Sequence, residues 1–195
     1  MPGRSWVRSA VARVRRQLRR LPDQLLHAAR RRAALVALAA RQPLRSVLVV
    51  CNGNIFRSPF AAAVLRRALG QSGVAVDSAG FIGPGRPSPA DAIAAAARRG
   101  IDLRGHRSQL LMTDLVRGAD VILVMDAAQR RLICERFGVP ARGVLLLGDF
   151  DPAPIESRAI EDPWEQGPDV CAAVYGRIED CVGALVRALR SVAMR

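Results

Sequence analysis

The sequence predicts an α/β fold: a three-layer open sandwich in which helices flank a four-stranded parallel sheet, with a helical extension at the N-terminus. Three observations lead to this prediction. Short apolar runs rich in β-branched residues alternate with segments of helical character, as in parallel sheets covered on both faces. Half of the 195 residues are apolar, which is enough to bury a sizeable core. The first 45 residues differ from the rest in charge and pattern.

We divide the chain into a basic helical extension, residues 1–45, and a domain, residues 46–195. The extension carries 12 Arg and one Asp, a net charge of +11, whereas the domain carries 18 Arg and 16 acidic residues, a net charge of +2. Apolar residues with helical spacing run through the extension: Val7, Val11, Val14, Leu18, Leu21 and Leu25. Pro22 is expected to break or kink this helix and Pro43 to end it, which predicts two helices over about residues 4–20 and 24–41.

The sequence leaves several roles open for the extension. It fits a solvated or loosely packed helix, an amphipathic helix that contacts anionic membranes through Trp6 and its arginines, or a transit peptide, and a start codon assigned too early would give the same pattern. Nucleic-acid binding is disfavoured, because the segment has one aromatic residue and no recognised motif. The apolar stretch Ala33 to Ala40 is too short to span a bilayer. We expect a cytoplasmic protein whose membrane association, if any, runs through residues 1–45.

The elements of the domain follow in order. Ser46 to Cys51 is a continuous apolar run typical of a central strand buried on both faces. Ser58 and Pro59 suit the N-cap and first position of a helix that continues to Leu69. The remaining elements are strands over Val74–Ser78, Asp120–Met125 and Gly143–Leu147, and helices over Asp91–Arg99, from the third strand to Phe137, and over about residues 169–192.

The segment after the first strand reads C-N-G-N-I-F-R-S and places Cys51 and Arg57 in a C-x5-R spacing. Parallel sheets carry their sites at the carboxyl ends of strands, and helix N-termini bind anions. Gly53 and Asn54 tolerate left-handed backbone angles, which lets the backbone amides turn inward around an anion. Arg57 can grip two phosphate oxygens, and Cys51 is expected to be a thiolate nucleophile that receives a hydrogen bond from Ser58. The predicted phosphate-binding loop comprises Asn52, Gly53, Asn54, Ile55, Phe56, Arg57 and Ser58.

The loop alone leaves an alternative open, in which Cys51 is a buried apolar residue at a strand end and Arg57 is solvated. The other cysteines, Cys134, Cys171 and Cys181, form no C-x-x-C pair, so neither a zinc knuckle nor a redox dithiol is indicated. Cys171 and Cys181 lie in an apolar helical stretch and are expected to be buried and inert. No His, Asp and Glu cluster suggests a metal site, so we expect neither a metal nor a cofactor.

Five motifs, one of them this loop, occur in the order found in the low-molecular-weight protein tyrosine phosphatase family. The chain resembles this family over essentially residues 46–195. The loop matches C-x-G-N-x-x-R-S-P, and the second strand ends in D-S-A-G at residues 77–80. Then follow G-I at residues 100–101 with H-R-S-Q at 106–109, a Met-Asp pair at 125–126, and D-P-W at 162–164. The resemblance implies hydrolysis of phosphotyrosine, an aryl phosphate, through a phosphocysteine intermediate.

The resemblance also implies catalytic roles. Cys51 is the nucleophile, Arg57 the phosphate clamp and Asp162 the general acid and base. Asp151 is also followed by proline and competes with Asp162 on local chemistry. The family takes its acid from the later pair, and Trp164 offers an aromatic wall beside Asp162.

Supporting residues carry over in the same way. In the family, a hydrogen-bond network holds the loop in its strained geometry, and its members here are Asn54, Ser58, Ser78 and His106. Phe81 and Trp164 are expected to form the pocket wall. Ile82 either joins this wall or belongs to the core.

The sequence departs from the family at two positions. Many members have a second cysteine directly before the signature arginine, where this chain has Phe56, so protection of Cys51 by a disulfide is in doubt. The aromatic pair that often follows D-P is reduced to Trp164 and Glu165. Arsenate reductases of similar fold need two further cysteines near residues 125–131, and none is present there. A catalytically silent phosphotyrosine-binding module is the competing class of function.

Partners follow from the resemblance alone. We expect a tyrosine-phosphorylated protein as substrate. The all-Arg, Ala-rich composition suggests a GC-rich, bacterial genome. In that setting the family analogy points to a bacterial tyrosine autokinase linked to exopolysaccharide export.

Overall fold

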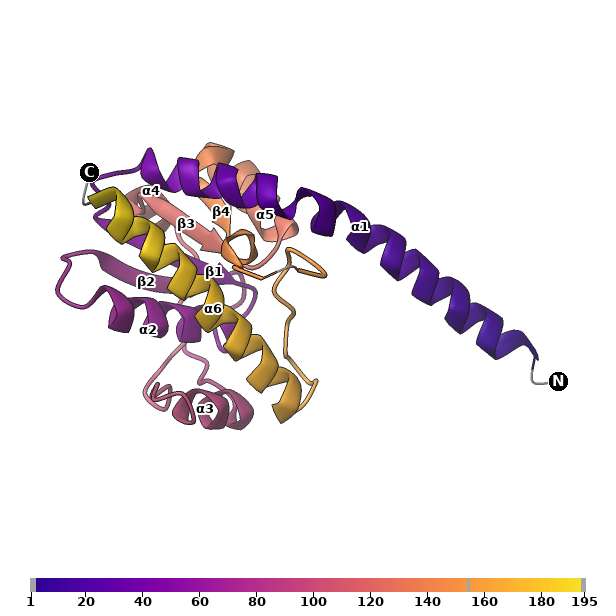
Figure 1. The fold of residues 1–195 in the computed structure, drawn as a ribbon. Helices are drawn as coiled ribbons and strands as arrows, with labels where there is room; N and C mark the ends of the chain where they lie inside the picture. Colours follow the sequence, from indigo (N-terminus) through magenta and orange to yellow (C-terminus); the bar gives the residue numbers. More distant parts are fainter. Residues whose placement is uncertain (1–2, 154, 194–195) are drawn as a thin grey trace.

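A computed structural model describes residues 3–153 and 155–193, with side chains from residue 21 to residue 191 except 154 (Figure 1). Four parallel strands form its sheet: β1 (Ser46–Cys51), β2 (Ala75–Gly80), β3 (Val121–Val124) and β4 (Val144–Leu146). They lie in the order β2-β1-β3-β4, so β1 is central and pairs with both β2 and β3. Its residues 47–51 are all buried, which explains the continuous apolar run in the sequence.

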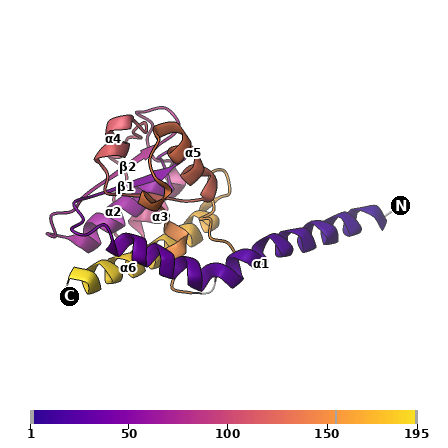
Figure 2. The same ribbon diagram turned by 90° about the horizontal axis from the view of Figure 1, so that it is seen from above.

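Helices cover both faces of the sheet, as Figures 1 and 2 show. One face packs against α2 (Arg57–Leu69), α3 (Ala90–Ala97), α6 (Pro168–Ala193) and the last part of α1 (Gly3–Ala39). The other face packs against α4 (Thr113–Gly118) and α5 (Ala127–Phe137). Two short 3-10 helices, η1 (Ala141–Gly143) and η2 (Leu147–Phe150), flank β4. The three-layer α/β prediction is confirmed, while α4 was not predicted.

The two-helix prediction for the extension is wrong, because α1 continues through Pro22. A proline removes one backbone donor without necessarily ending a helix, and Figure 1 shows α1 bending between its docked and projecting parts. Residues 21–39, here called the docked half of α1, lie along the domain. Ala34 and Leu38 are 5% and 2% exposed and belong to the core cluster around β1, α2 and α6. Trp6 and the first four members of the apolar stripe lie outside the described side chains.

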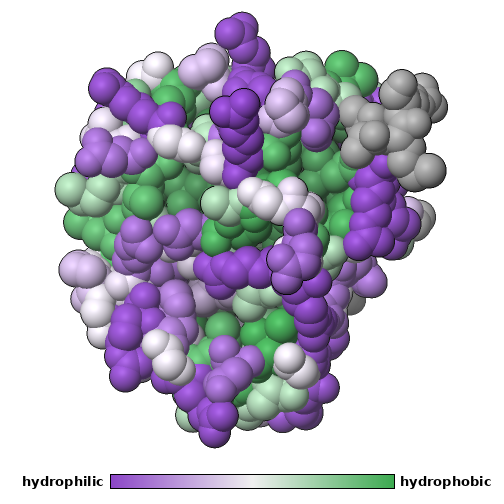
Figure 3. All heavy atoms as spheres, turned by 90° about the vertical axis from the view of Figure 1, so that its left-hand side faces the viewer, coloured by the Kyte–Doolittle hydropathy of each residue, from purple (hydrophilic) through white to green (hydrophobic). Residues whose placement is uncertain are grey.

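The two ends of the sheet differ. At the amino ends of the strands lie shallow pockets of about 210 and 300 Å³. Figure 3 views this end of the molecule and shows apolar surface, in green, between polar side chains, in purple. At the carboxyl ends, the segments after β1 and β2 converge with the irregular segment 151–153 and 155–167. The residues expected to carry chemistry lie at this second end, as the parallel topology requires.

Candidate active site

The phosphate-binding loop connects the end of β1 to the start of α2. Helix α2 begins at Arg57, two residues earlier than predicted, and its N-cap is Phe56, whose side chain makes no capping bond. The predicted N-cap role of Ser58 is therefore wrong. Its hydroxyl instead lies 3.0 Å from Cys51 Sγ, inside the loop. The helix N-terminus and the thiol thus face the same small space, where backbone N–H groups attract an anion.

Cys51 is 2% exposed, and its sulfur has two polar neighbours. The backbone N–H of Asn54 donates to it at 3.3 Å, and Ser58 Oγ is the second neighbour. Ser58 Oγ accepts a hydrogen bond from Asn54 Nδ2 at 2.8 Å, and its own proton can point to the sulfur at 3.0 Å or to the more distant carbonyl oxygen of Ala79 at 3.5 Å. Two donors aimed at one sulfur stabilise a thiolate.

Asn54 is the centre of the loop. It is fully buried and adopts a left-handed backbone with φ 51°, which costs an unsupported L-residue about 1–2 kcal/mol. Its Nδ2 also donates to Ser78 Oγ at 3.0 Å, its Oδ1 accepts from the backbone of Gln109 at 2.8 Å, and its carbonyl accepts from His106 Nε2 at 2.7 Å. The structure therefore brings together all four predicted network residues, Asn54, Ser58, Ser78 and His106.

Two glycines allow close packing around the loop. Gly80, at the end of β2, has no room for a side chain, because a Cβ would lie 2.7 Å from the carbonyl oxygen of Asn52. Gly53 does not take the left-handed conformation that its sequence suggested. The space beside it is occupied by Arg86 and Ile55, so its role is close packing and not backbone freedom.

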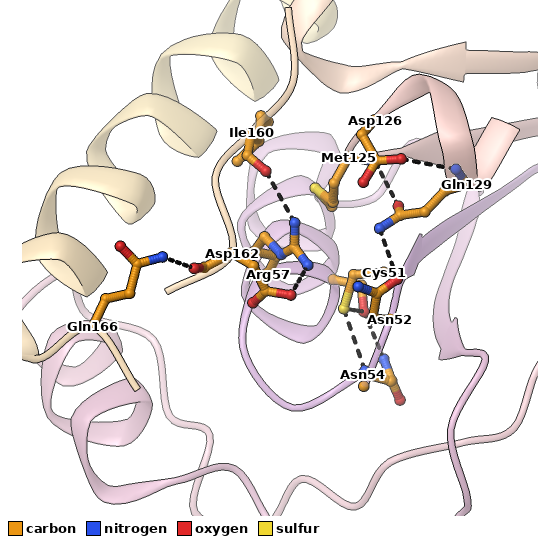
Figure 4. Close-up of polar contacts among 12 residues, drawn as sticks. Cys51, Asn52, Asn54, Arg57, Met125, Asp126, Gln129, Ile160, Asp162 and Gln166 are labelled. Atoms are coloured by element: carbon orange, nitrogen blue, oxygen red, sulfur yellow. Dashed lines mark hydrogen bonds and ion pairs between the residues drawn. The ribbon is translucent and has the colours of Figure 1, made fainter. Parts of the chain in front are cut away.

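The side chains of Arg57 and Asp162 point toward each other in the pocket (Figure 4). Its Nη2 forms an ion pair with the Asp162 carboxylate, and its Nη1 donates to the carbonyl oxygen of Ile160 at 2.9 Å. Nε of Arg57 is buried and has no hydrogen-bond partner among the described residues, so a donor is available for a phosphate oxygen. The Arg57 side chain is 3% exposed and that of Asp162 is 39% exposed. The Arg57 guanidinium is therefore held within the protein, whereas the Asp162 carboxylate reaches solvent.

The structure separates the two competing carboxylates. Asp151 is 6% exposed, pairs with Arg177 of α6 at 2.9 Å and does not line the pocket. Asp162 lines the pocket together with Cys51 and Arg57. The geometry thus places the later D-P pair, and not the earlier one, beside the thiol.

A pocket of about 360 Å³ opens over the loop. Trp164 and Ile82 line it and are 50% and 51% exposed, whereas Phe56 is buried beneath Trp164 in an edge-to-face contact with ring centroids 6.2 Å apart. The residue found in place of the second family cysteine thus supports the aromatic wall. The prediction that Phe81 forms the wall is wrong. Phe81 packs against the cluster between the sheet, α4 and α5, because the chain bends directly after β2 and turns this side chain away from the pocket.

Sequence reasoning missed three residues around the loop. Arg86 lines the pocket and donates from Nη2 to the carbonyl oxygen of Gly53 at 2.8 Å. Gln129 of α5 is 3% exposed and donates to Asn52 Oδ1 at 3.2 Å. Tyr175 of α6 is fully buried and donates to the carbonyl oxygen of Phe56 at 3.1 Å. All three come from distant segments, and no local pattern marks them.

The remaining cysteines lie away from the pocket. Cys171 and Cys181 are buried in α6, where burial raises the pKa of each thiol, to about 11 and about 12. Their predicted inertness is consistent with these shifts, because only the thiolate is reactive. Within the part of the chain that the structure describes, no group of three His, Cys, Asp or Glu side chains could hold a metal ion. The absence of a cofactor stays a prediction.

Comparison with known proteins decides the family. Residues 46–193 match the family described as low molecular weight phosphotyrosine protein phosphatase. The chain belongs to this family. A relative named as the probable low molecular weight protein-tyrosine-phosphatase EpsP, from Ralstonia solanacearum, is 40% identical over 151 residues, which are 76% of this chain and 99% of that protein.

Solved structures of the family share the fold. Wzb of Vibrio vulnificus, in complex with benzylphosphonate, is 28% identical and superposes with a TM-score of 0.66, covering 74% of this chain and 98% of that one. The arginine phosphatase YwlE of Geobacillus stearothermophilus is also 28% identical, with a TM-score of 0.70 over 77% of this chain and 96% of that one. The family match begins at residue 46, so the whole of α1 lies outside it.

Proposed function

We propose that this chain is a protein-tyrosine phosphatase that hydrolyses phosphotyrosine through a phosphocysteine on Cys51. The observation that carries the proposal is that one pocket joins the Cys51 thiol, the Arg57 guanidinium and the Asp162 carboxylate. The relatives named as tyrosine phosphatases support it. The two donors to the Cys51 sulfur argue against the alternative of an inert buried cysteine.

In the first step, the Cys51 thiolate attacks phosphorus in line and the bond to the phenolic oxygen breaks. Backbone N–H groups at the start of α2 and the Arg57 guanidinium stabilise the charge on the equatorial oxygens. Asp162 gives its proton to the leaving phenolate, so tyrosine departs neutral. Arg57 exchanges its ion pair with Asp162 for the phosphate, which frees the carboxyl group for this role.

In the second step, a water molecule attacks the phosphocysteine and the Asp162 carboxylate takes its proton. The sulfur–phosphorus bond breaks, inorganic phosphate leaves and the thiolate is restored. Ser58 stabilises the departing sulfur through its hydroxyl. Asp162 loses one proton and regains one in each cycle, so the protons balance over the two steps without a metal or a redox partner.

The pocket favours an aryl ester over a phosphorylated arginine. Ile55, Phe56, Ile82 and Trp164 form apolar walls that suit a phenyl ring. Asp162 is the one carboxylate among the described lining residues, and it is engaged by Arg57. A guanidinium group would therefore find no free counter-charge in the described walls. The benzylphosphonate complex of Wzb is in keeping with an aryl ligand, whereas the name of YwlE supplies the arginine alternative to be tested.

The proposed substrate is a tyrosine-phosphorylated protein, and by family analogy a bacterial tyrosine autokinase linked to exopolysaccharide export. Autokinase dephosphorylation would be tested directly by loss of phosphotyrosine from such a kinase. A silent binding module is disfavoured, because the nucleophile, the clamp and the acid are all present in the pocket.

We also propose that the projecting part of α1 contacts anionic membranes from a cytoplasmic location. None of the described helices combines the length and hydropathy that crossing a bilayer requires. Leu21 and Leu25, the last members of the apolar stripe, are 44% and 79% exposed, so these two side chains are not used for packing on the domain. Seven arginines precede residue 21 without an acidic residue, which suits an anionic surface.

Hydrolysis of matched peptides tests the enzyme. Wild type is expected to release phosphate from a phosphotyrosine peptide and to leave a phosphoarginine peptide intact. Preference for phosphoarginine would replace the tyrosine proposal. Binding of phosphotyrosine without turnover would favour the module.

Co-sedimentation with anionic vesicles tests the membrane contact on the full chain. Replacing Leu21 and Leu25 with serine is expected to weaken binding. Val36→Ser is the comparison variant, since Val36 is 69% exposed on the same helix but lies about three turns beyond Leu25, near the end of the docked half. Equal binding by wild type and the stripe variant would reject the contact.

A further inference from the structure

The docked half of α1 touches the loop that carries Asp162. This acid loop comprises residues 151–153 and 155–163. Asp23 accepts a hydrogen bond from the backbone N–H of Arg158 at 3.0 Å, and His27 donates from Nε2 to the carbonyl oxygen of Asp151 at 2.9 Å. Asp23 and His27 are four positions apart on a helix and therefore face the same way. The helix thus holds the acid loop at two backbone positions.

The two side chains stand on a fixed support. Asp23 is also paired with Arg30 of the same helix at 2.5 Å, and its side chain is 20% exposed. Further along the helix, on the same side, Ala34 and Leu38 are buried in the core. Because the core anchors α1, the positions of Asp23 and His27 are set by the domain itself.

A short path leads from these contacts to the acid. Arg158 lies four positions before Asp162. Between them, Ile160 donates its N–H to the carbonyl oxygen of Met125 at 2.8 Å and accepts from Arg57 Nη1. The segment is therefore tied to α1 at one point and to the end of β3 and the clamp at the next, and Asp162 follows two residues later.

The acid loop has no helix or strand of its own, so such ties determine its place. From the domain side, Arg177 of α6 donates to the carbonyl oxygens of Ser157 and Ala159 at 2.5 and 2.8 Å. The Arg158 side chain forms a two-point ion pair with Asp149, at 3.0 and 2.5 Å. The contacts from α1 complete this set from the opposite side.

We propose that Asp23 and His27 are positioning residues for the general acid: the docked half of α1 braces the acid loop and so sets the place of Asp162 over the pocket. The inference rests on the proposed function, in which Asp162 protonates the leaving group. Both residues lie outside the stretch that matches the family, so this brace is an addition to the family domain.

The test compares two aryl phosphates that differ in their need for an acid. Phenyl phosphate has a basic leaving group and depends on proton transfer, whereas p-nitrophenyl phosphate has a good leaving group and depends on it less. Asp23→Ala in the full chain is expected to lower kcat about 10-fold for phenyl phosphate and about twofold for p-nitrophenyl phosphate, because small misplacement of an acid is costly.

Conservative variants and a matched control separate the brace from general damage. Asp23→Asn keeps an oxygen that can accept from the Arg158 N–H and is expected to stay within about twofold of wild type for both esters. His27→Gln keeps a donor, whereas His27→Phe removes it and is expected to behave like Asp23→Ala. Val36→Ala, at a 69% exposed position on the other side of the same helix, is expected to change neither rate.

A double variant makes the test specific. In an Asp162→Ala background, Asp23→Ala is expected to have no further effect on the ratio of the two rates. An unchanged ratio in Asp23→Ala and His27→Phe would overturn the brace, as would an equal effect without Asp162. If Asp23→Ala does not fold, the comparison of His27→Gln with His27→Phe tests the brace in its place. A wild type that hydrolyses neither ester would contradict the proposed function itself, whereas an active wild type with an insensitive ratio contradicts the brace alone.

Discussion

The phosphate-binding loop and the acid loop meet at one pocket but are held differently. In the first, Asn54 bonds to Cys51 and Ser58 within the loop, and the adjacent strand contributes Ser78. In the second, regular structure is absent and the ties come from α1, β3 and α6. The loop that binds the anion thus combines bonds within its own sequence with support from distant residues such as His106 and Gln109, while the loop that moves the proton is held mainly by remote supports.

This contrast has a physical reason. Binding an anion needs converging N–H groups, which one tight loop and a helix N-terminus supply locally. Proton transfer needs a carboxyl group that reaches the leaving oxygen and still exchanges with water, and Asp162 is 39% exposed accordingly. A partly exposed side chain on an irregular segment can hold its place only if the backbone behind it is fixed.

The largest effect is expected from removing the nucleophile. Cys51→Ala should lower turnover by about 10⁴-fold or more, because the covalent path is lost, while phosphotyrosine binding persists. Steady-state hydrolysis and peptide binding measure the two properties. Cys134→Ala, a half-buried thiol on α5 away from the pocket, is the control. Turnover that survives in Cys51→Ala would remove the basis for the mechanism.

Removing the acid comes next. Asp162→Ala should lower kcat by about 10²–10³-fold for phenyl phosphate and less for p-nitrophenyl phosphate, since the second leaving group needs little protonation. Asp151→Asn keeps the packing of the other aspartate and serves as comparison. A larger catalytic loss in Asp151→Asn than in Asp162→Ala would reverse the assignment of the acid.

The network of the first loop is the third target. Asn54→Ala removes the hydrogen bonds and leaves a left-handed alanine, and it should lower the free energy of unfolding by about 1–3 kcal/mol and kcat by about 10-fold. Asn54→Gly loses the same bonds but relieves the backbone, so it should be more stable than Asn54→Ala by about 1 kcal/mol. Urea unfolding measures both. Equal stability of the two variants would show that backbone strain is unimportant there.

Alkaline pH should weaken the support beneath both loops. Burial raises the pKa of Cys181 from 9.0 to about 12, so the unfolded chain loses this proton first. The contribution of this thiol to the free energy of unfolding is therefore fully present below pH 9. It should fall by about 1 kcal/mol for each pH unit between 9 and 12. Urea midpoints across this range test the slope, which should decrease in Cys181→Ala. A slope that the variant leaves unchanged would assign the effect to other groups.

The smallest effect concerns the contact of α6 with the first loop. Tyr175→Phe keeps the stacked contact with Phe60, whose ring centroid is 3.8 Å away, but leaves the carbonyl oxygen of Phe56 without its donor. The expected loss in unfolding free energy is about 1–2 kcal/mol, with kcat for either ester within about twofold of wild type. A large fall in kcat would mean that the catalytic geometry of the first loop depends on this one bond.

The same contrast explains what the sequence could predict. Strand β1, the C-x5-R loop and the order of elements follow from local patterns, and resemblance added Ser78, His106 and Asp162. The docking of α1 was missed, because Leu21 and Leu25, the described end of the apolar stripe, are exposed, while Ala34 and Leu38 pack on the domain. Asp23 and His27 are polar and gave no sign of burial, and Pro22 suggested a break where the helix continues.

Pocket walls were predicted only in part. Trp164 lines the pocket as expected, but at the end of β2 Ile82, and not Phe81, points into it. The chain bends directly after β2, and sequence alone does not say which way each side chain turns there. Arg86 reaches the pocket from an irregular segment, where its direction depends on tertiary contacts.

Trapping the intermediate tests the central claim most directly. The Asp162→Ala chain, mixed with p-nitrophenyl phosphate, quenched in acid and digested, is expected to carry one phosphoryl group on the peptide that contains Cys51. The same treatment of a Cys51→Ala, Asp162→Ala double variant should give no label. A phosphoryl group on another residue of a catalytically competent chain, or turnover with no label on Cys51, would contradict the phosphocysteine mechanism.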